Sequence, residues 1–350
     1  MTAKFSIQGR AIGPGQPAYV IAEVSANHNQ RFEEAEKLVR VAKESGADAV
    51  KLQTYTPDTI TIRSDSPLFR HGKGSLWDGR TLYDLYGEAY TPWDWQPKLK
   101  ALADEIGIHL FSSAFDDTAV DFLEGMKVPA YKIASFEIID LPLVRKMART
   151  GKPLIISTGM ASLAEIEEAV RAARDAGAVE IALLKCTSAY PAPPEEANLR
   201  TIPHMAETFG VVTGLSDHTL GISVPVVAVT LGASIIEKHF TLSRATPGPD
   251  SAFSIEPDEL RAMIAAIRTA EKALGSVHYG AFGREEKSMQ FRRSLFIVRD
   301  VRAGEALTRE NTRSIRPGHG LPPKHLDEIL GRRASRDIDR GTPLAWELVR

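Results

Sequence analysis

The first 240 residues alternate between short apolar runs and longer segments in which apolar residues recur at helical spacing. The runs are four to six residues long and rich in Val, Ile and Leu. This alternation is typical of consecutive βα units. Eight runs are expected to form strands, at residues 19–23, 49–54, 109–112, 130–133, 154–157, 181–186, 211–215 and 235–239.

The segments between these runs are expected to form amphipathic helices, for example at residues 32–45, 162–177, 223–232 and 257–275. In the second of them, Ser162 followed by Glu165 has the pattern of a capping box. Gly177 is suited to end the same helix, because glycine adopts the left-handed conformation found there.

Eight consecutive βα units predict an α/β fold with a closed (β/α)₈ TIM barrel, because a doubly wound open sheet usually stops at five or six strands. The barrel is expected to span residues 1–276. Residues 277–292 lose the apolar periodicity and are expected to be a linker. From residue 293 to 350, short strand-like runs and turns predict a small β-rich module.

Composition and charge narrow the class of protein. Hydrophobic residues make up 43% and charged residues 25%, which is typical of a globular chain. The net charge of −2 argues against nucleic acid or an anionic membrane as a partner, although residues 284–350 carry 15 basic and 10 acidic side chains, a net charge of +5. No run approaches the roughly 18 apolar residues of a membrane span, and the first residues lack the apolar centre of a signal peptide, so a cytoplasmic protein is expected.

Cys186 is the only cysteine of the chain. An intramolecular disulfide and a thiolate zinc cluster within one chain are therefore excluded. The apolar neighbours Leu183 and Leu184 favour a buried packing role for this thiol over that of a nucleophile.

Polar residues gather where the apolar runs end, which is the face at which barrel enzymes keep their chemistry. His218 and His239 end the seventh and eighth runs. Neighbouring strands lie about 5 Å apart, so the two imidazoles could share one metal ion. They could equally be unrelated polar residues, or an acid and a base. The chain lacks an H-E-x-x-H pattern and a carboxylate-rich loop, which disfavours a zinc protease or a calcium site.

Lysine and serine side chains are expected to surround the same mouth. This ring would bind a phosphate and a carboxylate, and it comprises Lys51, Lys132, Lys238, Ser113, Ser135, Ser157 and Ser216. Lys132 or Lys185 could instead form a Schiff base. Glu23, at the end of the first run, is a candidate general acid or base, with an ion-pair role as the alternative.

Seven sequence strings occur in an order that resembles the sialic acid synthase family. They are AEVSANHN (22–29), GADAVKLQTY (46–55), YKIASFE (131–137), STGMAS (157–162), GLSDHTLG (214–221), EKHFTL (237–242) and GPDSAFS (248–254). The carboxyl-terminal module resembles an antifreeze-like (SAF) domain. The resemblance implies condensation of phosphoenolpyruvate with an acetamido sugar, a divalent metal such as manganese, with magnesium or cobalt as alternatives, and a homodimer in which each module covers the partner's barrel.

The same resemblance assigns roles to individual residues. His218 and His239 would be the metal ligands, and Glu23 the catalytic carboxylate. The phosphoenolpyruvate cradle would comprise Lys51, Ser113, Lys132, Ser135, Ser157 and Ser216. Tyr190 and Asp250 would hold the acceptor sugar. Arg316, in the segment RPGHG, would belong to a lid over the substrate.

Several positions are more similar to the pseudaminic acid synthase branch than to the N-acetylneuraminate branch. They are Gln30, Ser188, Ser251, Ala252 and Phe253. The pseudaminic branch uses a 2,4-diacetamido-2,4,6-trideoxy hexose, and a 6-deoxy methyl group calls for a less polar pocket. An N-acetylneuraminate or legionaminate synthase is the alternative. Outside this class, a metal-independent lysine aldolase and a non-enzymatic sugar-binding protein remain open. The insert at residues 55–91 could shape or cover the pocket.

Overall fold

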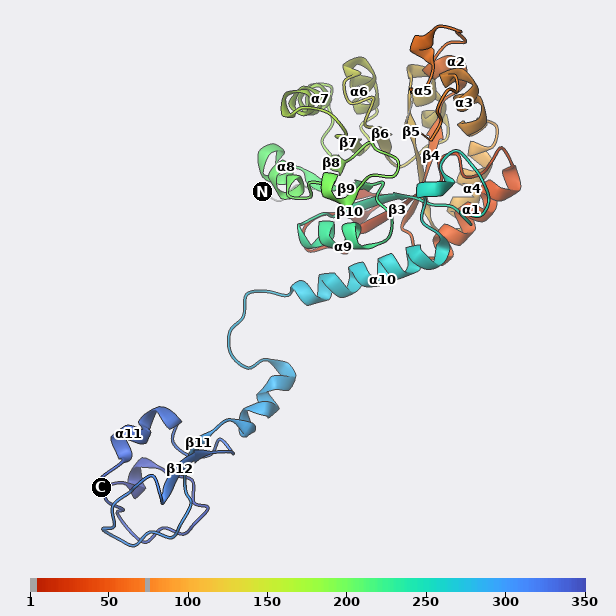
Figure 1. Cartoon of the computed structure of the whole chain (residues 1–350). Helices are drawn as coiled ribbons and strands as arrows, with labels where there is room; N and C mark the ends of the chain where they lie inside the picture. Colours follow the sequence, from red (N-terminus) through yellow and green to blue (C-terminus); the bar gives the residue numbers. More distant parts are fainter. Residues whose placement is uncertain (1–4, 73–75) are drawn as a thin grey trace. The chain divides into compact units, whose positions relative to one another are not determined.

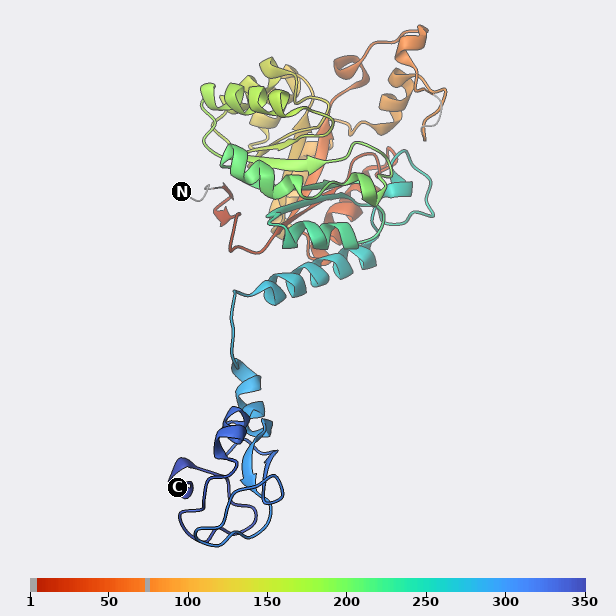
Figure 2. The ribbon, with the colours of Figure 1, turned by 60° about the vertical axis from the view of Figure 1, so that its left-hand side comes forward.

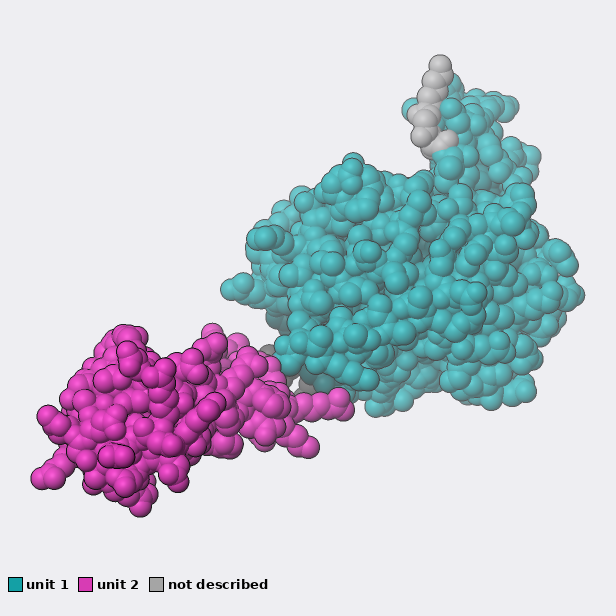
Figure 3. Space-filling view, turned by 60° about the horizontal axis from the view of Figure 1, so that its bottom comes forward, with its two compact units in different colours: residues 1–275 teal, residues 276–350 magenta. Residues whose placement is uncertain are grey.

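The structure is a computed structural model that describes residues 5–72 and 76–350. The chain divides into two compact units, residues 1–275 and residues 276–350, which Figure 3 shows in different colours. Each unit has its own apolar core and is described by itself.

The first unit is built on a closed barrel, in which the described residues form eight parallel strands (Figure 1). The strands are β3 (Tyr19–Glu23), β4 (Ala49–Thr54), β5 (His109–Ala114), β6 (Tyr131–Ile133), β7 (Leu154–Ser157), β8 (Ile181–Cys186), β9 (Val212–Asp217) and β10 (Ile235–His239). They follow one another in sequence order around the ring, and pairing of β10 with β3 closes it. The predicted fold class is therefore confirmed. β5 and β9 run two residues further than expected, because pairing with their neighbours continues to those ends.

Helices surround the ring of strands in Figures 1 and 2. They are α1 (Phe32–Glu44), α4 (Gln96–Ile106), α5 (Asp117–Gly125), α6 (Leu141–Ala148), α7 (Leu163–Asp175), α8 (Thr201–Phe209), α9 (Ser223–Thr230) and α10 (Pro257–Leu274). The expected capping box of α7 is confirmed, since Ser162 and Glu165 exchange hydrogen bonds. After this helix, the Ala178 amide donates to the Ala173 carbonyl at 3.0 Å, and Gly177 has a φ of 105°. The chain thus ends α7 with the glycine that the sequence indicated.

A long insert follows β4 and precedes α4. It contains α2 (Pro57–Ile60), the 3₁₀ helix η1 (Pro67–Phe69) and α3 (Leu82–Ala89). Helices α2 and α3 pack together and are drawn in orange and brown in Figure 1. Because the insert leaves the carboxyl end of β4, it lies on the face where polar strand-end residues gather.

The amino-terminal end of the barrel is closed by a short hairpin, β1 (Ser6–Ile7) and β2 (Arg10–Ala11). Ser6 donates through its backbone amide and hydroxyl to Glu180, just before β8. Arg10 forms an ion pair with Asp48, just before β4. These contacts leave the carboxyl-terminal end of the strands as the accessible mouth.

Apolar side chains from alternate strand positions fill the barrel below that mouth. Phe111, Leu184 and Ile235 belong to one buried cluster. Gly214 lies between the last two, and a Cβ at this position would come 2.3 Å from the Ile235 carbonyl oxygen and 2.7 Å from Leu184 Cδ2. Only glycine fits there, and its presence lets the neighbouring strands close with a dry interior beneath the polar layer.

The second unit contains two short antiparallel strands, β11 (Ser294–Ile297) and β12 (Thr312–Ile315), together with isolated β-bridges. It also contains α11 (Leu326–Ile329) and three 3₁₀ helices within residues 276–350, namely η4 (Gly283–Phe291), η5 (Pro323–His325) and η6 (Trp346–Leu348). Its core includes Leu295, Ile297 and Leu344. The segment expected to be a linker, residues 277–292, contains η4. Across the described parts of both units, no helix is long and apolar enough to span a membrane.

Candidate functional site

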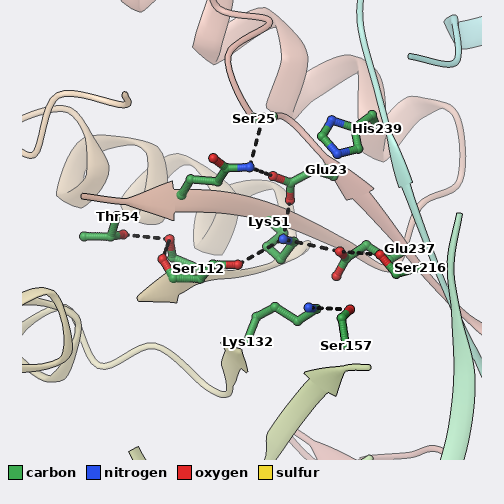
Figure 4. A network of polar contacts seen from close by, with 12 residues as sticks. Glu23, Ser25, Lys51, Thr54, Ser112, Lys132, Ser157, Ser216, Glu237 and His239 are labelled. Carbon is green, nitrogen blue, oxygen red and sulfur yellow. Dashed lines mark hydrogen bonds and ion pairs between the residues drawn. The ribbon is translucent and has the colours of Figure 1, made fainter. Parts of the chain in front are cut away.

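Charged side chains are buried at the mouth of the barrel, at strand positions that face its axis (Figure 4). Lys51 from β4 lies between Glu23 from β3 and Glu237 from β10. The exposed fractions of these three side chains are 4%, 1% and 6%. Closure of the barrel brings the groups together, because β10 and β4 both pair with β3.

Lys51 is the centre of this cluster. Its Nζ lies 2.9 Å from Glu23 Oε2 and 3.3 Å from Glu237 Oε1, and it donates to Ser113 Oγ at 3.0 Å. Ser216 donates to the same Glu237 oxygen at 3.3 Å. The ammonium group therefore has carboxylates on two strands and a hydroxyl on a third.

The protonation of the cluster follows from its burial and charges. Burial raises the pKa of Glu23 to about 7, against the opposing effect of Lys51. Burial alone would lower the pKa of Lys51, but the two carboxylates reverse this effect and raise it. Glu23 is thus a group that can hold or release a proton near neutral pH.

A second ammonium group lies in the same layer. Lys132 Nζ donates to Ser157 Oγ at 2.7 Å and to the Ile133 carbonyl at 2.9 Å. Its pKa is lowered by burial. Two lysines with serine hydroxyls beside them form a site suited to a phosphate and a carboxylate. Ser135 belongs to a different part of the mouth, where its hydroxyl lies 2.8 Å from that of Ser188.

The two strand-end histidines lie side by side, with ring centroids 5.3 Å apart. The Nδ1 of His218 donates to the Thr187 carbonyl at 2.9 Å. Burial would lower the pKa of His218, but Cys186 and the Thr187 carbonyl raise it. The Nδ1 of His239 is buried with no hydrogen-bond partner and lies 3.9 Å from Asp250 Oδ2. Burial and the neighbouring charges lower the pKa of His239 well below its ordinary value, so this ring is neutral.

A neutral imidazole with an unpaired nitrogen, as in His239, fits a divalent metal. Within residues 5–72 and 76–350, however, no group of three or more His, Cys, Asp or Glu side chains is arranged to hold an ion. The chain therefore offers two imidazoles, and an ion held by them would keep open positions for water or substrate.

Glutamine and serine side chains connect the buried cluster to the sugar-site carboxylate expected from the sequence. Gln53 Nε2 lies 2.9 Å from both Glu23 Oε1 and Ser25 Oγ, and it donates to each. Ser25 donates in turn to Asp250. This chain of contacts fixes Glu23 relative to Asp250.

A cavity of ≈ 440 Å³ opens beside these residues. Its polar lining includes Ser25, Gln53, Ser135, Glu137, Tyr190, His239 and Asp250. Tyr190 packs with its ring centroid 4.5 Å from His218 and 5.2 Å from Phe253. The residues expected for the sugar therefore line one cavity with a strand-end imidazole.

The structure corrects the expected position of Lys238. This residue lies between Glu237 and His239 in β10, so its side chain points away from the mouth. Its Nζ forms a buried ion pair with Asp217 Oδ2 and donates to the Thr219 carbonyl. In β8, Lys185 precedes the buried Cys186, so the two side chains lie on opposite faces of the strand. The Nζ of Lys185 donates to the Cys186 carbonyl at 2.8 Å. Neither lysine belongs to the cluster around Lys51.

Two carboxylates of the mouth were missed by the sequence analysis. Glu237 could have been found from strand alternation, since it shares a face with His239. Glu137 lies in the loop after β6, and its buried Oε2 has no hydrogen-bond partner. Burial raises the pKa of Glu137 to about 7.

Arg316 lies on the exposed loop after β12, in the second unit.

Comparison with known proteins matches both units of the chain. Residues 38–279 match the model of the NeuB family, and residues 292–350 match that of the SAF domain. The pseudaminic acid synthase of Helicobacter pylori is 46% identical over 331 residues, covering 94% of this chain and 97% of that protein. The N,N'-diacetyllegionaminic acid synthase of Legionella pneumophila is 37% identical, with 96% of each chain covered. The crystal structure of the Bacillus subtilis spore coat polysaccharide biosynthesis protein SpsE aligns with a TM-score of 0.67 at 33% identity, covering 99% of each chain.

Replacing Glu137 with glutamine is expected to change how stability depends on pH. Between pH 4.5 and about 7, folded Glu137 keeps a proton that the unfolded chain releases, so the free energy of unfolding falls as pH rises through this window. Besides burial, Lys132, Asp140 and Lys51 act on this carboxyl group. Glu137→Gln lacks the effect and is expected to gain about 1–3 kcal/mol relative to wild type on going from pH 5 to pH 8.

Urea unfolding of both proteins at the two pH values measures this difference. Glu168→Gln, on the exposed face of α7, is the matched control and is expected to keep the wild-type slope. Equal slopes for Glu137→Gln and wild type would contradict the assignment.

Proposed function

The chain belongs to the NeuB family, and we propose that it acts as a pseudaminic acid synthase. It would condense phosphoenolpyruvate with 2,4-diacetamido-2,4,6-trideoxy-L-altrose and release phosphate. The observation that carries this proposal is the anion site around Lys51 and Lys132, next to a cavity lined by Tyr190 and Asp250. Similarity along nearly the whole chain to the Helicobacter pylori enzyme supports the same acceptor, and identity to the legionaminic acid synthase is lower.

The reaction gives each part of the site a task. Lys51 and Lys132 hold the phosphate and carboxylate of phosphoenolpyruvate, assisted by Ser113, Ser157 and Ser216. The enol carbon attacks the aldehyde carbon of the sugar and forms the new carbon–carbon bond. Water then adds to the carbon that bears the phosphate, and phosphate leaves from that carbon with cleavage of the carbon–oxygen bond. Glu23, with its pKa near neutrality, exchanges the proton that moves between water, substrate and product.

We propose His218 and His239 as ligands of a divalent metal. Manganese is our choice, with magnesium or cobalt as alternatives, although imidazole alone would favour zinc, iron or nickel. When bound, the ion would supply polarisation of the sugar aldehyde. The unpaired Nδ1 of His239 supports this role, as does the ring of His218 beside it.

We also propose that the enzyme is a cytoplasmic homodimer in which the SAF domain of each chain covers the partner's barrel. The net charge of +5 in residues 284–350 suits a lid over anionic substrate. Arg316 is exposed in its own unit, and its rigid donor fork suits a sugar carbonyl or hydroxyl. Exclusion of water by such a lid would strengthen the polar contacts beneath it.

The acceptor is tested by phosphate release from phosphoenolpyruvate with manganese and a panel of acetamido sugars. The 2,4-diacetamido-2,4,6-trideoxy-L-altrose is expected to give the highest kcat/KM, with N-acetylmannosamine about 100-fold lower. A higher kcat/KM for N-acetylmannosamine or for a 2,4-diacetamido mannose would assign the chain to another branch. Turnover without phosphate release, together with a lysine adduct that borohydride traps, would identify an aldolase instead. Binding of the sugar without turnover would identify a sugar-binding protein.

The metal site is tested by isothermal titration calorimetry, in which manganese is titrated into the protein in the absence of substrates. His218→Ala and His239→Ala are each expected to weaken binding by about 10–100-fold or more, since loss of a partner that merely supports a ligand has an effect of that size. Both variants should also lose most metal-dependent activity. His204→Ala, on the exposed face of α8, is the control. Unchanged manganese affinity in both strand-end variants would refute the assignment.

The exchanged lid is tested by complementation between two inactive chains, Arg316→Ala and His239→Ala. In a mixed dimer, one of the two sites would have both residues intact. Random subunit exchange is therefore expected to restore about a quarter of wild-type activity. Mass spectrometry of native dimers confirms that exchange has occurred. No recovery despite exchange would exclude the crossed arrangement.

A further inference from the structure

We propose that Trp77, in the insert between β4 and α4, determines which acceptor sugar the enzyme uses. Its indole would form the apolar wall that receives C6 of the sugar and favours a methyl group over a hydroxymethyl group there. This inference rests on the proposed function, because it concerns the far end of the same acceptor.

The indole of Trp77 is fixed against the loop that carries a sugar-site residue. Its Nε1 donates to the Pro249 carbonyl at 3.1 Å, and Pro249 directly precedes Asp250. The ring centroid lies 5.4 Å from that of His71 and 5.9 Å from that of Tyr190. A residue of the insert is thereby fastened to segments that are more than a hundred positions away in sequence.

The cavity lining differs in polarity between the strand ends and the insert. The strand ends and the loops after them contribute the polar groups named above, together with Phe115, Ala134, Phe136, Pro249 and Phe253. The insert contributes mainly hydrocarbon, from Ile60, Trp77, Leu85, Tyr86 and Ala89, besides Tyr55 and His71. A sugar whose aldehyde lies near His239 would therefore direct the other end of its carbon chain toward the insert.

The chemistry of indole explains why this wall discriminates. Indole has a single hydrogen-bond donor and no acceptor, and in Trp77 the donor is already engaged by Pro249. A C6 methyl group placed against the ring loses only contact with water. A C6 hydroxyl group would give up hydrogen bonds to water and would gain none from the indole. Discrimination of this kind is limited to about 10–100-fold.

Trp77 also separates two hollows of the barrel unit. A second hollow of ≈ 590 Å³ is lined by Asn29, Gln30, Leu76, Arg80, Glu88 and the loop at residues 247–249, and it shares Trp77 and Pro249 with the inner cavity. Removing the indole would open one hollow to the other. Water could then reach C6 and solvate a hydroxyl group, which would remove the basis for rejection.

The test compares two pairs of acceptors that differ only by the C6 hydroxyl group. One pair is the 2,4-diacetamido-2,4,6-trideoxy sugar and its 6-hydroxy counterpart, and the other is N-acetyl-6-deoxymannosamine and N-acetylmannosamine. The ratio of kcat/KM within each pair is measured for wild type, Trp77→Ala, Trp77→Phe and Leu76→Ala. Leu76 is the matched control, because it lines the second hollow of ≈ 590 Å³ and is not part of the lining of the ≈ 440 Å³ cavity.

Wild type is expected to favour the 6-deoxy member of each pair by about 10–100-fold. Trp77→Ala should reduce this ratio at least several-fold, and Trp77→Phe, which retains an apolar ring, should keep most of it. Leu76→Ala should leave the ratio unchanged. The KM for phosphoenolpyruvate should not move in any variant, which separates a local effect from damage to the whole mouth.

An unchanged ratio in Trp77→Ala would overturn the inference, as would an equal loss in Leu76→Ala. If Trp77→Ala does not fold, the test uses Trp77→Phe, which retains an apolar ring. Loss of the preference for the 6-deoxy sugar in Trp77→Phe would then overturn the inference. Failure of the proposed function is a separate result, in which wild type prefers N-acetylmannosamine to the diacetamido sugar. The ratio within the mannosamine pair would still test Trp77 in that case.

Discussion

The ion pairs of Lys51 with Glu23 and Glu237 are the interaction on which the mouth of this barrel depends. Three charges are held out of water, and a buried ion pair is favourable only when hydrogen bonds satisfy its remaining groups. Ser113, Ser216 and Gln53 supply several of those bonds from other strands, whereas Glu237 Oε2 is buried without a hydrogen-bond partner. The cluster therefore requires the ring of strands to close in one register, and a bound anion would compete with the carboxylates for the same ammonium group.

The barrel separates stability from chemistry along its axis. Apolar side chains such as Phe111 and Ile235 fill the interior below the mouth, and the close approach at Gly214 keeps that layer tight. The polar layer then lies on a rigid support, so its distances are set by strand pairing and not by loop conformation. On the outer side of the same strands, the buried pair of Lys238 and Asp217 connects β10 to β9, directly beside the two histidines.

The anion site and the apolar part of the cavity come from different parts of the chain. The residues around Lys51 and the two imidazoles come from strand ends and suit a reaction of phosphoenolpyruvate. The insert at residues 55–91 contributes the apolar part of the cavity and is fastened to the loop after β10 through Trp77. In the proposed arrangement the wall would contact only parts of the acceptor that do not react, so it would affect the choice of sugar without changing the reaction.

The order of strands and helices could be predicted from the sequence, because short apolar runs and period-3.6 patterns are local properties. The sequence also identified Glu23, Lys51 and Lys132 as strand-end residues, since such positions follow from the pattern. Which face of β10 lies inside the barrel became clear only in the folded chain. Alternation places Glu237 on the face of His239 and Lys238 on the opposite face, but both faces carry polar residues. Packing against the neighbouring strands settled which of the two faces is inside the barrel. The contact of Trp77 with Pro249 was beyond the sequence for the same reason, because it joins residues 172 positions apart through the closure of the barrel.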